Sequence, residues 1–261
     1  MSAVGATWDP FGPSYDLPPY PSPPRAYLIA TTPRSGSHFL GHLLRATGQL
    51  GAPLEYFKPD RIATWQALHG LASAEDAIAR LLQLRTSPSG WFGVKAHGPD
   101  YELFAESGLA ARFPAFERIV HTIRRDRVAQ AVSLSVAQQT GAWISFHRVR
   151  GQARYDFAAI HAALRGINSD ALAWQARLEV SAVPRYTVVY EELVADPKHQ
   201  VQALLTWFGL DPDVAGDPCF DLMPARQAKP SNLVWAQRFT QDFVEVYGQD
   251  ALVELLDLGN A

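Results

Sequence analysis

A buried strand that passes through a short polar turn into a helix constrains the fold of this chain more than any other feature. Residues 26–32 are mostly apolar and end in two threonines, and residues 39–44 continue as an amphipathic helix. The turn between them consists of six residues: Pro33, Arg34, Ser35, Gly36, Ser37 and His38. The first N–H groups of a helix have no partner within it, and the helix dipole favours negative charge there. We therefore expect this turn to bind an anion.

The turn differs from the two best-known phosphate-binding loops. A Walker A loop has Gly-Lys followed by Ser or Thr, and its lysine reaches the β- and γ-phosphates. In this chain Arg34 precedes the glycine, no lysine lies in the turn, and a Gly-x-Gly-x-x-Gly fingerprint is absent. Taken alone, the turn also fits an ordinary strand–helix connection in which a serine caps the helix.

Composition excludes several classes of protein. The chain has 261 residues, 48% of them hydrophobic, which is enough for one large domain or two small ones with a sizeable core. Its net charge of −3 argues against a nucleic-acid partner. The single cysteine, Cys219, excludes an internal disulfide and fits a reducing compartment. Because the sequence has neither a long apolar run nor a signal-peptide pattern, we expect a soluble cytoplasmic protein without a transmembrane segment.

The first 24 residues are rich in proline: Pro10, Pro13, Pro18, Pro19, Pro21, Pro23 and Pro24. Such a segment excludes a regular helix or a central strand. We expect residues 1–24 to be an extended arm, either mobile or laid over the rest of the protein. Residues 25–261 are then expected to form a single domain.

Beyond the arm, short apolar strands alternate with helical patterns. The expected strands are residues 27–32, 91–96, 118–123 and 186–190. The expected helices are residues 37–47, 74–85, 101–111, 127–140, 156–180, 198–208, 233–247 and 250–256, with Gly166 as a point where the longest could break. This alternation predicts a three-layer α/β fold in which helices cover both faces of a central parallel sheet. Ligands are then expected at the carboxyl ends of the strands.

A second basic cluster follows the third expected strand. Arg124, Arg125 and Asp126 lead into the helix that contains Ser133. The arginine fork suits phosphate oxygens, and the serine could add a hydroxyl. Alone, the cluster fits a solvated surface slightly better, with the serine bonded to its own helix. Beside the first turn, on the same edge of the sheet, it indicates a second phosphate site.

Together these motifs resemble the sulfotransferases that use 3′-phosphoadenylyl sulfate (PAPS). The turn resembles their 5′-phosphosulfate loop, and Arg124 with Ser133 resembles their 3′-phosphate motif. Residues 46–57, residues 130–133 and the Arg226-Gln227-Ala228 string are similar to blocks of the bacterial trehalose 2-sulfotransferase family and occur in the same order. This resemblance implies a P-loop-like fold, PAPS as co-substrate with PAP as product, and a homodimer.

The resemblance also implies roles for individual residues. The residue matching Glu55 is the family's proposed general base, and Arg226 matches a basic residue that contacts the 3′-phosphate. Arg34 would bind the 5′-phosphate or polarise the bridging oxygen. Lys95 would stabilise the sulfuryl group, although it also fits a lysine that extends from a strand end to solvent. His97 stands where the family has a bulky apolar residue, and it is a rival base because many animal and plant sulfotransferases use histidine.

We therefore expect in-line sulfuryl transfer from PAPS to a small-molecule hydroxyl acceptor, a carbohydrate or a glycolipid. No metal is expected, because the sequence has no zinc-binding spacing. Two alternatives stay open. A P-loop kinase acting on a small molecule would need a lysine in the turn and an acidic magnesium ligand. A non-catalytic nucleotide-binding module, or a degenerate sulfotransferase, would keep the turn without the chemistry.

Overall fold

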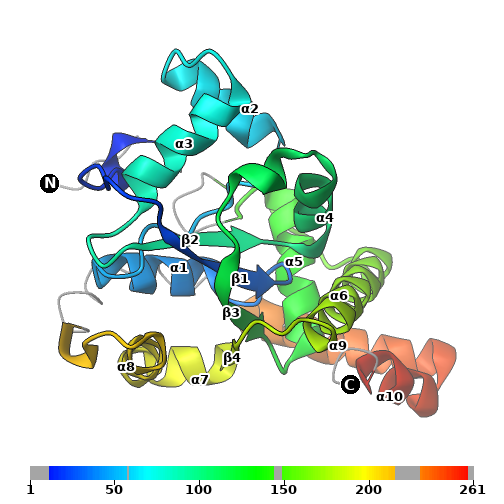
Figure 1. The fold of residues 1–261 in the computed structure, drawn as a ribbon. Helices are drawn as coiled ribbons and strands as arrows, with labels where there is room; N and C mark the ends of the chain where they lie inside the picture. The colour runs from blue at the N-terminus through cyan, green and yellow to red at the C-terminus, as the bar shows by residue number, and fades with distance from the viewer. Residues whose placement is uncertain (1–11, 58, 144–148, 215–229, 258–261) are drawn as a thin grey trace, which may run out of the picture.

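One parallel sheet forms the centre of the molecule. The computed structural model describes residues 12–57, 59–143, 149–214 and 230–257 (Figure 1). Its strands are β1 (Arg25–Thr31), β2 (Trp91–Ala96), β3 (Phe116–Ile123) and β4 (Arg185–Val189). They lie in the order β2-β1-β3-β4, and every neighbouring pair is parallel. The predicted parallel sheet is confirmed: the bounds of β2 agree with the prediction, and the ends of the other strands agree to within two residues.

Ten α-helices and three short 3₁₀ segments lie in the described ranges. The helices are α1 (Ser37–Ala46), α2 (Pro59–Leu68), α3 (Ala74–Arg85), α4 (Gly98–Glu106), α5 (Arg127–Thr140), α6 (Phe157–Glu179), α7 (Tyr190–Ala195), α8 (Pro197–Phe208), α9 (Pro230–Tyr247) and α10 (Gln249–Asp257). The 3₁₀ segments are η1 (Pro13–Tyr15), η2 (Leu109–Arg112) and η3 (Pro212–Val214). None of these helices has both the length and the apolar character needed to cross a membrane.

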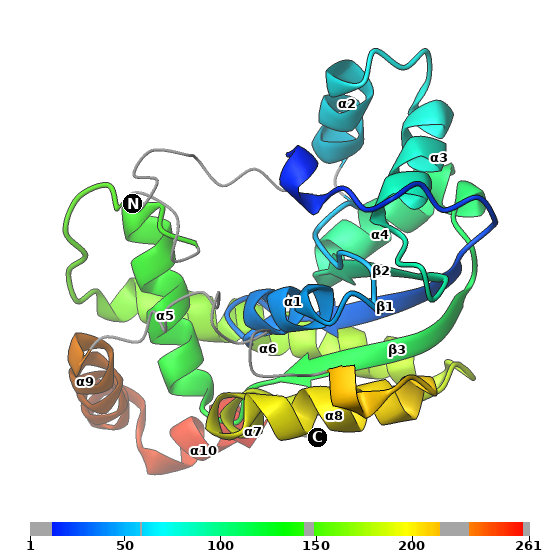
Figure 2. The same ribbon diagram turned by 90° about the vertical axis from the view of Figure 1, so that its left-hand side faces the viewer.

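Helices cover both faces of the sheet, as the three-layer prediction requires. On one face, Tyr27 and Ile29 of β1 belong to a core with side chains of α1, α7 and α8. On the other face, Leu28 and Ala30 belong to a core with side chains of α2, α3, α4 and α6. A third core joins α5, α6, α9 and α10. Of these helices, α5, α9 and α10 lie at the side of the molecule away from α2 and α3 (Figure 2). Because β1 is buried on both faces, its side chains are almost all apolar.

The parallel arrangement brings the carboxyl ends of the strands to one edge. Ala30 of β1 pairs with Ala96 of β2, and Thr31 pairs with Thr122 of β3. The turn after β1, residue 97 after β2 and residue 124 after β3 therefore emerge side by side. This edge is where the sequence predicted ligand binding.

The described part of the proline-rich segment, residues 12–24, lies against the end of α3. The N–H of Leu17 donates to the carbonyl of Leu84, and the N–H of Tyr20 donates to the carbonyl of Gln83. Within this segment η1 forms one helical turn, which was not expected. A proline in its first turn permits it, because that position needs no N–H partner.

Several helices differ from the prediction. Helix α2 and helix α7 were missed, since each is short and lacks a clear apolar period. Helix α4 begins at Gly98 rather than residue 101 and ends at Glu106, shortly before Gly108 adopts a left-handed backbone (φ 74°). Helix α6 continues through Gly166, because buried residues on both sides, Leu164 and Ile167 among them, pack against α5 and α9. Packing there outweighs the cost of a helical glycine, about 1 kcal/mol.

Candidate active site

The turn after β1 contains two residues with left-handed backbone. Arg34 has φ 64° and is the one non-glycine residue with positive φ in the described ranges. Gly36 has φ 85° and caps the amino end of α1. A Cβ atom on Gly36 would lie 2.4 Å from a ring carbon of Tyr190, at the start of α7. A strained non-glycine residue costs on the order of 1–3 kcal/mol and persists only where the surroundings impose it, often at functional sites.

A side chain of α5 and the side chain that directly follows β3 impose this turn geometry. Gln130 Nε2 donates to the carbonyl of Pro33 at 2.6 Å and to the hydroxyl of Thr32 at 2.9 Å. Arg124 Nη1 donates to the carbonyl of Arg34 at 3.3 Å. These bonds hold the main-chain carbonyls of the turn, so its N–H groups at the start of α1 are the groups it can offer to an anion.

The hydroxyl of Ser35 points into the protein rather than toward a ligand. It contacts the hydroxyl of Thr31 at 2.6 Å and that of Thr122 at 2.9 Å, and it lies 2.9 Å from the carbonyl of Thr32. Ser35 is only 1% exposed. Its side chain therefore ties the turn to β1 and β3, and only its backbone remains to contact an anion.

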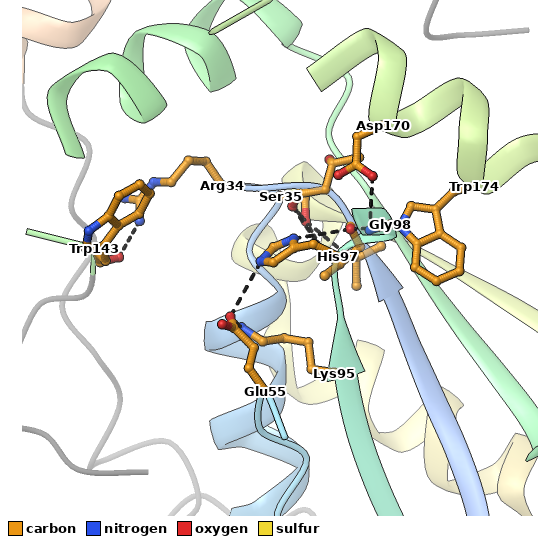
Figure 3. Close-up of polar contacts among 12 residues, drawn as sticks. Arg34, Ser35, Glu55, Lys95, His97, Gly98, Trp143, Asp170 and Trp174 are labelled. Carbon is orange, nitrogen blue, oxygen red and sulfur yellow. Dashed lines mark hydrogen bonds and ion pairs between the residues drawn. The ribbon is translucent and has the colours of Figure 1, made fainter. Parts of the chain in front are cut away.

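The side chain of Arg34 joins the two predicted anion-binding motifs. Its Nε donates to Ser133 Oγ at 2.9 Å, and its Nη1 donates to the carbonyl of Trp143 (Figure 3). Burial and the neighbouring charge of Arg124 lower the pKa of Arg34 to about 10. Arg34 is therefore still a cation at neutral pH, and two guanidinium groups meet where β1 and β3 end.

A cavity of about 390 Å³ lies between the carboxyl end of β3, the first half of β4 and the last turns of α6. The arginines among its lining residues are Arg124, Arg125, Arg127 and Arg185. With one acidic residue, Glu179, beside these four arginines, the lining carries a net positive charge, which is suited to an anion. Arg226, expected to contribute to the same region, lies outside the described residues.

A second cluster lies where β2 ends and consists of Glu55, Lys95 and His97 (Figure 3). The segment before α2 runs beside β2, with Leu54 bridged to Val94, and this places Glu55 next to Lys95. Lys95 Nζ lies 2.8 Å from Glu55 Oε1, and His97 Nε2 lies 3.5 Å from the same oxygen. The Lys95 side chain is 4% exposed and that of Glu55 is 29% exposed, so the carboxylate is the more accessible member of the pair.

Opposing effects act on the acidity of Glu55. Burial alone would raise its pKa, but the Lys95 ammonium and the His97 contact outweigh burial and hold the pKa well below its usual range. Glu55 is therefore a carboxylate at neutral pH and can accept a proton. The same contacts make it a weak base.

Histidines in α1 form a neutral pair near this cluster. His38 and His42 contact each other through their Nε2 atoms at 3.0 Å. Burial, aided by the charge of Lys95, lowers the pKa of His38 to about 2. Burial and the charges of Arg45 and Lys95 lower the pKa of His42 to about 4. Both rings are uncharged at neutral pH, so His38 brings no positive charge to the turn.

The structure brings together most of the predicted site residues. Turn residues 33–38 lie with Arg124 and Ser133, and Glu55 lies with Lys95 and His97. The missed contributors are Gln130, Tyr190 and the main-chain carbonyl of Thr31, whose oxygen lies 3.3 Å from His97 Nδ1. Gln130 precedes Ser133 by one helical turn, a spacing that signals a shared face. Nothing in the sequence signals the other two. In the described part of the chain, no three His, Cys, Asp or Glu residues are grouped as metal ligands.

Comparison with known proteins identifies the family. A family model described as Stf0 sulphotransferase matches residues 26–86 and 106–242, which is more than half of the chain. This chain belongs to the Stf0 sulphotransferase family. It is a sulfotransferase, an enzyme that transfers sulfuryl groups, and the predicted family is confirmed. Neither the kinase nor the non-catalytic alternative is favoured by this match.

Curated relatives of this sulfotransferase include trehalose 2-sulfotransferases from Mycolicibacterium smegmatis and Mycobacterium tuberculosis. Each is 28% identical to it, over 259 and 258 residues. The matches cover 84% and 82% of this chain and 96% and 94% of the relatives. The family model leaves out residues 87–105, so Lys95 and His97 lie outside the matched stretches.

Solved structures similar to this sulfotransferase are also sulfotransferases. One from Mycobacterium avium has a TM-score of 0.48 and 12% identity, covering 87% of this chain and 78% of its own. The sulfotransferase domain of the Synechococcus PCC 7002 olefin synthase has a TM-score of 0.47 and 19% identity, covering 94% and 98%.

Proposed function

We propose that this sulfotransferase moves the sulfuryl group of PAPS to a carbohydrate hydroxyl, with Glu55 as the base. The observation that carries this proposal is the 2.8 Å contact between the Glu55 carboxylate and Lys95 at the sheet edge where the anion turn emerges. A proton acceptor and a cation side by side, next to an anion site, meet the needs of sulfuryl transfer.

The donor binds along the carboxyl edge of β1 and β3. Its 5′-phosphosulfate lies on the N–H groups of residues 35–38, and its 3′-phosphate lies between Arg124 and Ser133. Ser133 Oγ accepts a hydrogen bond from Arg34, so its own hydrogen is still available to a phosphate oxygen. The guanidinium of Arg34 extends away from the Glu55 cluster toward Trp143 (Figure 3), and its Nε donates to Ser133. This direction supports a role in binding phosphate rather than contact with the sulfuryl group.

Transfer proceeds in line, by positioning and charge stabilisation as in phosphoryl transfer. The acceptor oxygen forms a bond to sulfur while the bond from sulfur to the 5′-phosphate oxygen breaks, and PAP leaves with those electrons. Glu55 takes the proton of the acceptor hydroxyl. Lys95 stabilises the negative charge on the sulfuryl oxygens.

The names of the curated relatives support a sugar acceptor, with trehalose as the first compound to test. A glycolipid that presents a sugar hydroxyl is the second. A cytoplasmic location and a homodimer belong to the proposal as well. The single cysteine fits the first, and the family resemblance implies the second.

Two measurements test this function. PAP should raise the melting temperature, because a ligand at about 100 times its dissociation constant stabilises a protein by about 2.7 kcal/mol. Magnesium-ATP at the same concentration should have a smaller effect. Sulfur-labelled PAPS with trehalose should give a labelled sugar. Stabilisation by ATP but not by PAP would contradict the proposal.

A further inference from the structure

Two of the four arginines that line the cavity beside α6 take no part in the proposed donor site, and these are Arg127 and Arg185. The other two are directed toward α7. The guanidinium carbon of Arg124 lies 4.5 Å from the ring centre of Tyr190, at the start of that helix. Arg125 forms an ion pair with a glutamate of the same helix. Arg127 and Arg185 therefore remain to give the cavity its own positive charge.

The cavity lies against the face of the sheet that α6 covers. Along β3, Ile119 belongs to the core that includes α6, whereas Val120 belongs to the core that includes α1, α7 and α8. Because side chains alternate along a strand, His121 lies on the α6 face, as Ile119 does. The same rule places Arg185 of β4 on this face, since Val188 belongs to the opposite core. The anion turn leads into α1, which covers the opposite face, so this cavity is separate from the expected position of PAPS.

The polar side chains on this face are neighbours in the sheet. His121 of β3 is in register with Thr187 of β4, and Arg185 lies two residues before Thr187 on the same face. Neither His121 nor Thr187 forms a side-chain hydrogen bond with another described residue, and Arg185 pairs with no described carboxylate. Arg127, at the start of α5, lines the same cavity and is only 5% exposed. Two guanidinium groups, an imidazole and a hydroxyl therefore line one space.

The rest of the lining includes an apolar wall. Ile123 of β3 and Ala171 and Leu178 of α6 contribute to it. The volume of about 390 Å³ falls within the range of roughly 300–1,000 Å³ that is typical of small-molecule sites. A few polar groups in a partly apolar cavity are the usual composition of such sites. The cavity therefore has room for an oxyanion and for an organic group attached to it.

We propose that this cavity is a second oxyanion site, which takes the phosphate or sulfate group of a small molecule other than PAPS. Arg127 and Arg185 supply charged N–H groups whose forked geometry suits the oxygens of such a group. His121 and Thr187 each add one hydrogen-bond donor. This site goes beyond the proposed transfer reaction, whose donor and base lie at the carboxyl edge of the sheet.

The ring of His121 can report whether the cavity is occupied. Burial, followed by the charges of Arg185 and Arg127, lowers the pKa of His121 to about 4, so the ring is neutral at pH 7. The charged side chains that line the cavity with this ring are Arg124, Arg125, Arg127, Glu179 and Arg185. An oxyanion between the arginines would offset their charge and favour the imidazolium. Binding should therefore raise the pKa of His121, and the anion should bind more tightly as the pH falls.

Inorganic sulfate and glucose 6-phosphate are the probes, and both are added to the full chain at constant ionic strength, with and without saturating PAP. The NMR signals of the His121 ring, identified by comparison with His121→Gln, follow binding. We expect a saturable change in these signals and a ring that titrates at higher pH. PAP should change the affinity by less than about twofold, as for independent sites. Tighter binding of sulfate would support a free ion as the ligand, and tighter binding of glucose 6-phosphate would support an ester.

Arg185→Gln tests whether the probe binds in this cavity. Arg185 is exposed, so the variant should fold, and loss of its charged donors should weaken sulfate binding about tenfold. PAP affinity should stay within about twofold of wild type. Arg118→Gln is the matched control, because Arg118 of β3 lies on the opposite face of the sheet, with its guanidinium carbon 5.4 Å from the ring centre of Trp207. This control should bind sulfate as wild type does.

Three results would overturn the second site. The first is the absence of a saturable signal from either probe up to about 20 mM, beyond the range of a millimolar site. The second is equal sulfate affinity in wild type and Arg185→Gln. The third is displacement of sulfate by PAP, which would place the ion in the donor site. Wild-type protein that does not bind PAP would instead contradict the proposed function, and the comparison with Arg185→Gln would still decide on this site.

Discussion

At the residue scale, the Glu55 carboxyl group lies in a partly buried position, where an isolated carboxyl group would hold its proton more tightly. Lys95, at 2.8 Å, reverses this tendency and keeps the group ionised. An ionised carboxylate is the form that a base requires. Its low pKa also limits how firmly it can keep the proton it takes.

Removing the charge of Glu55 tests its role directly. Glu55→Gln has nearly the same shape but cannot accept a proton, so turnover should fall about 100-fold or more. PAP affinity, measured by calorimetry, should be retained. Glu245→Gln, at an exposed position of α9, is the matched control and should leave both quantities unchanged. Normal turnover in Glu55→Gln would transfer the role of base to another group.

The charge of Lys95 can be removed in the same way. Burial raises the pKa of Glu55, and the charge of Lys95 lowers it. Lys95→Met removes that charge, so the pKa of Glu55 should rise. A carboxyl group with a depressed folded-state pKa adds stability above its unfolded pKa, and this stability is lost as pH falls through the folded value. The variant should therefore lose less stability than wild type on acidification. Carbon-13 titration of the Glu55 carboxyl group and urea unfolding at several pH values measure both effects, and an unmoved pKa would contradict them.

At the element scale, the β1–α1 turn depends on its glycine for two separate reasons. Gly36 has a left-handed backbone, and its missing Cβ leaves room for Tyr190 of α7. The left-handed backbone is a local property of the turn. The contact with Tyr190 exists only because α7 packs beside α1. Gly248 has a similar φ of 88°, but a Cβ atom there would have open space within 4 Å, so this position isolates the local effect.

Alanine substitutions at these two glycines should therefore differ. Gly248→Ala should cost about 1 kcal/mol of folding free energy, the penalty for an alanine in left-handed backbone. Gly36→Ala also places a Cβ atom 2.4 Å from a ring carbon of Tyr190, so it should destabilise the protein more and weaken PAP binding at least tenfold. Urea unfolding and calorimetry measure the two effects. Equal behaviour of the two variants would show that the Tyr190 contact does not matter.

At the scale of the whole molecule, the proline-rich segment is bound to the body by a buried charge. Arg85, at the end of α3, has a fully buried side chain that pairs with Asp16 at 3.1 Å. Its guanidinium also lies 4.9 Å from the ring centre of Trp65 in α2. Asp16 therefore compensates a cation that would otherwise be buried without a carboxylate.

Asp16→Asn should destabilise the protein by about 2–3 kcal/mol. This cost is at or below the range found when one partner of a buried ion pair is removed, because Asp16 is partly exposed. The Arg25–Glu117 pair is a matched control, since both of its side chains are about half exposed. Glu117→Gln should cost less than about 1 kcal/mol. Denaturant unfolding compares the two variants. Equal costs would mean that Arg85 does not depend on Asp16.

Local patterns allowed much of the fold to be predicted. The apolar strands and the anion turn were evident because their signals lie within a few neighbouring residues. Helix α2 and the continuity of α6 through Gly166 were not, because packing against other elements stabilises them. The inward direction of the Ser35 hydroxyl, toward Thr31 and Thr122, likewise depends on residues that are distant in the sequence or on another strand.

The sequence by itself determined the parallel α/β fold, the turn with a positive residue and no Walker lysine, and the family. These depend on residue type and on spacing along the chain. Only the tertiary structure decided that Glu55 meets Lys95 and His97, and that the ring of His97 is oriented by the Thr31 carbonyl, 66 residues earlier. The physical reason is that parallel strands bring distant residues to one edge, where distances of a few ångströms set charge and proton affinity.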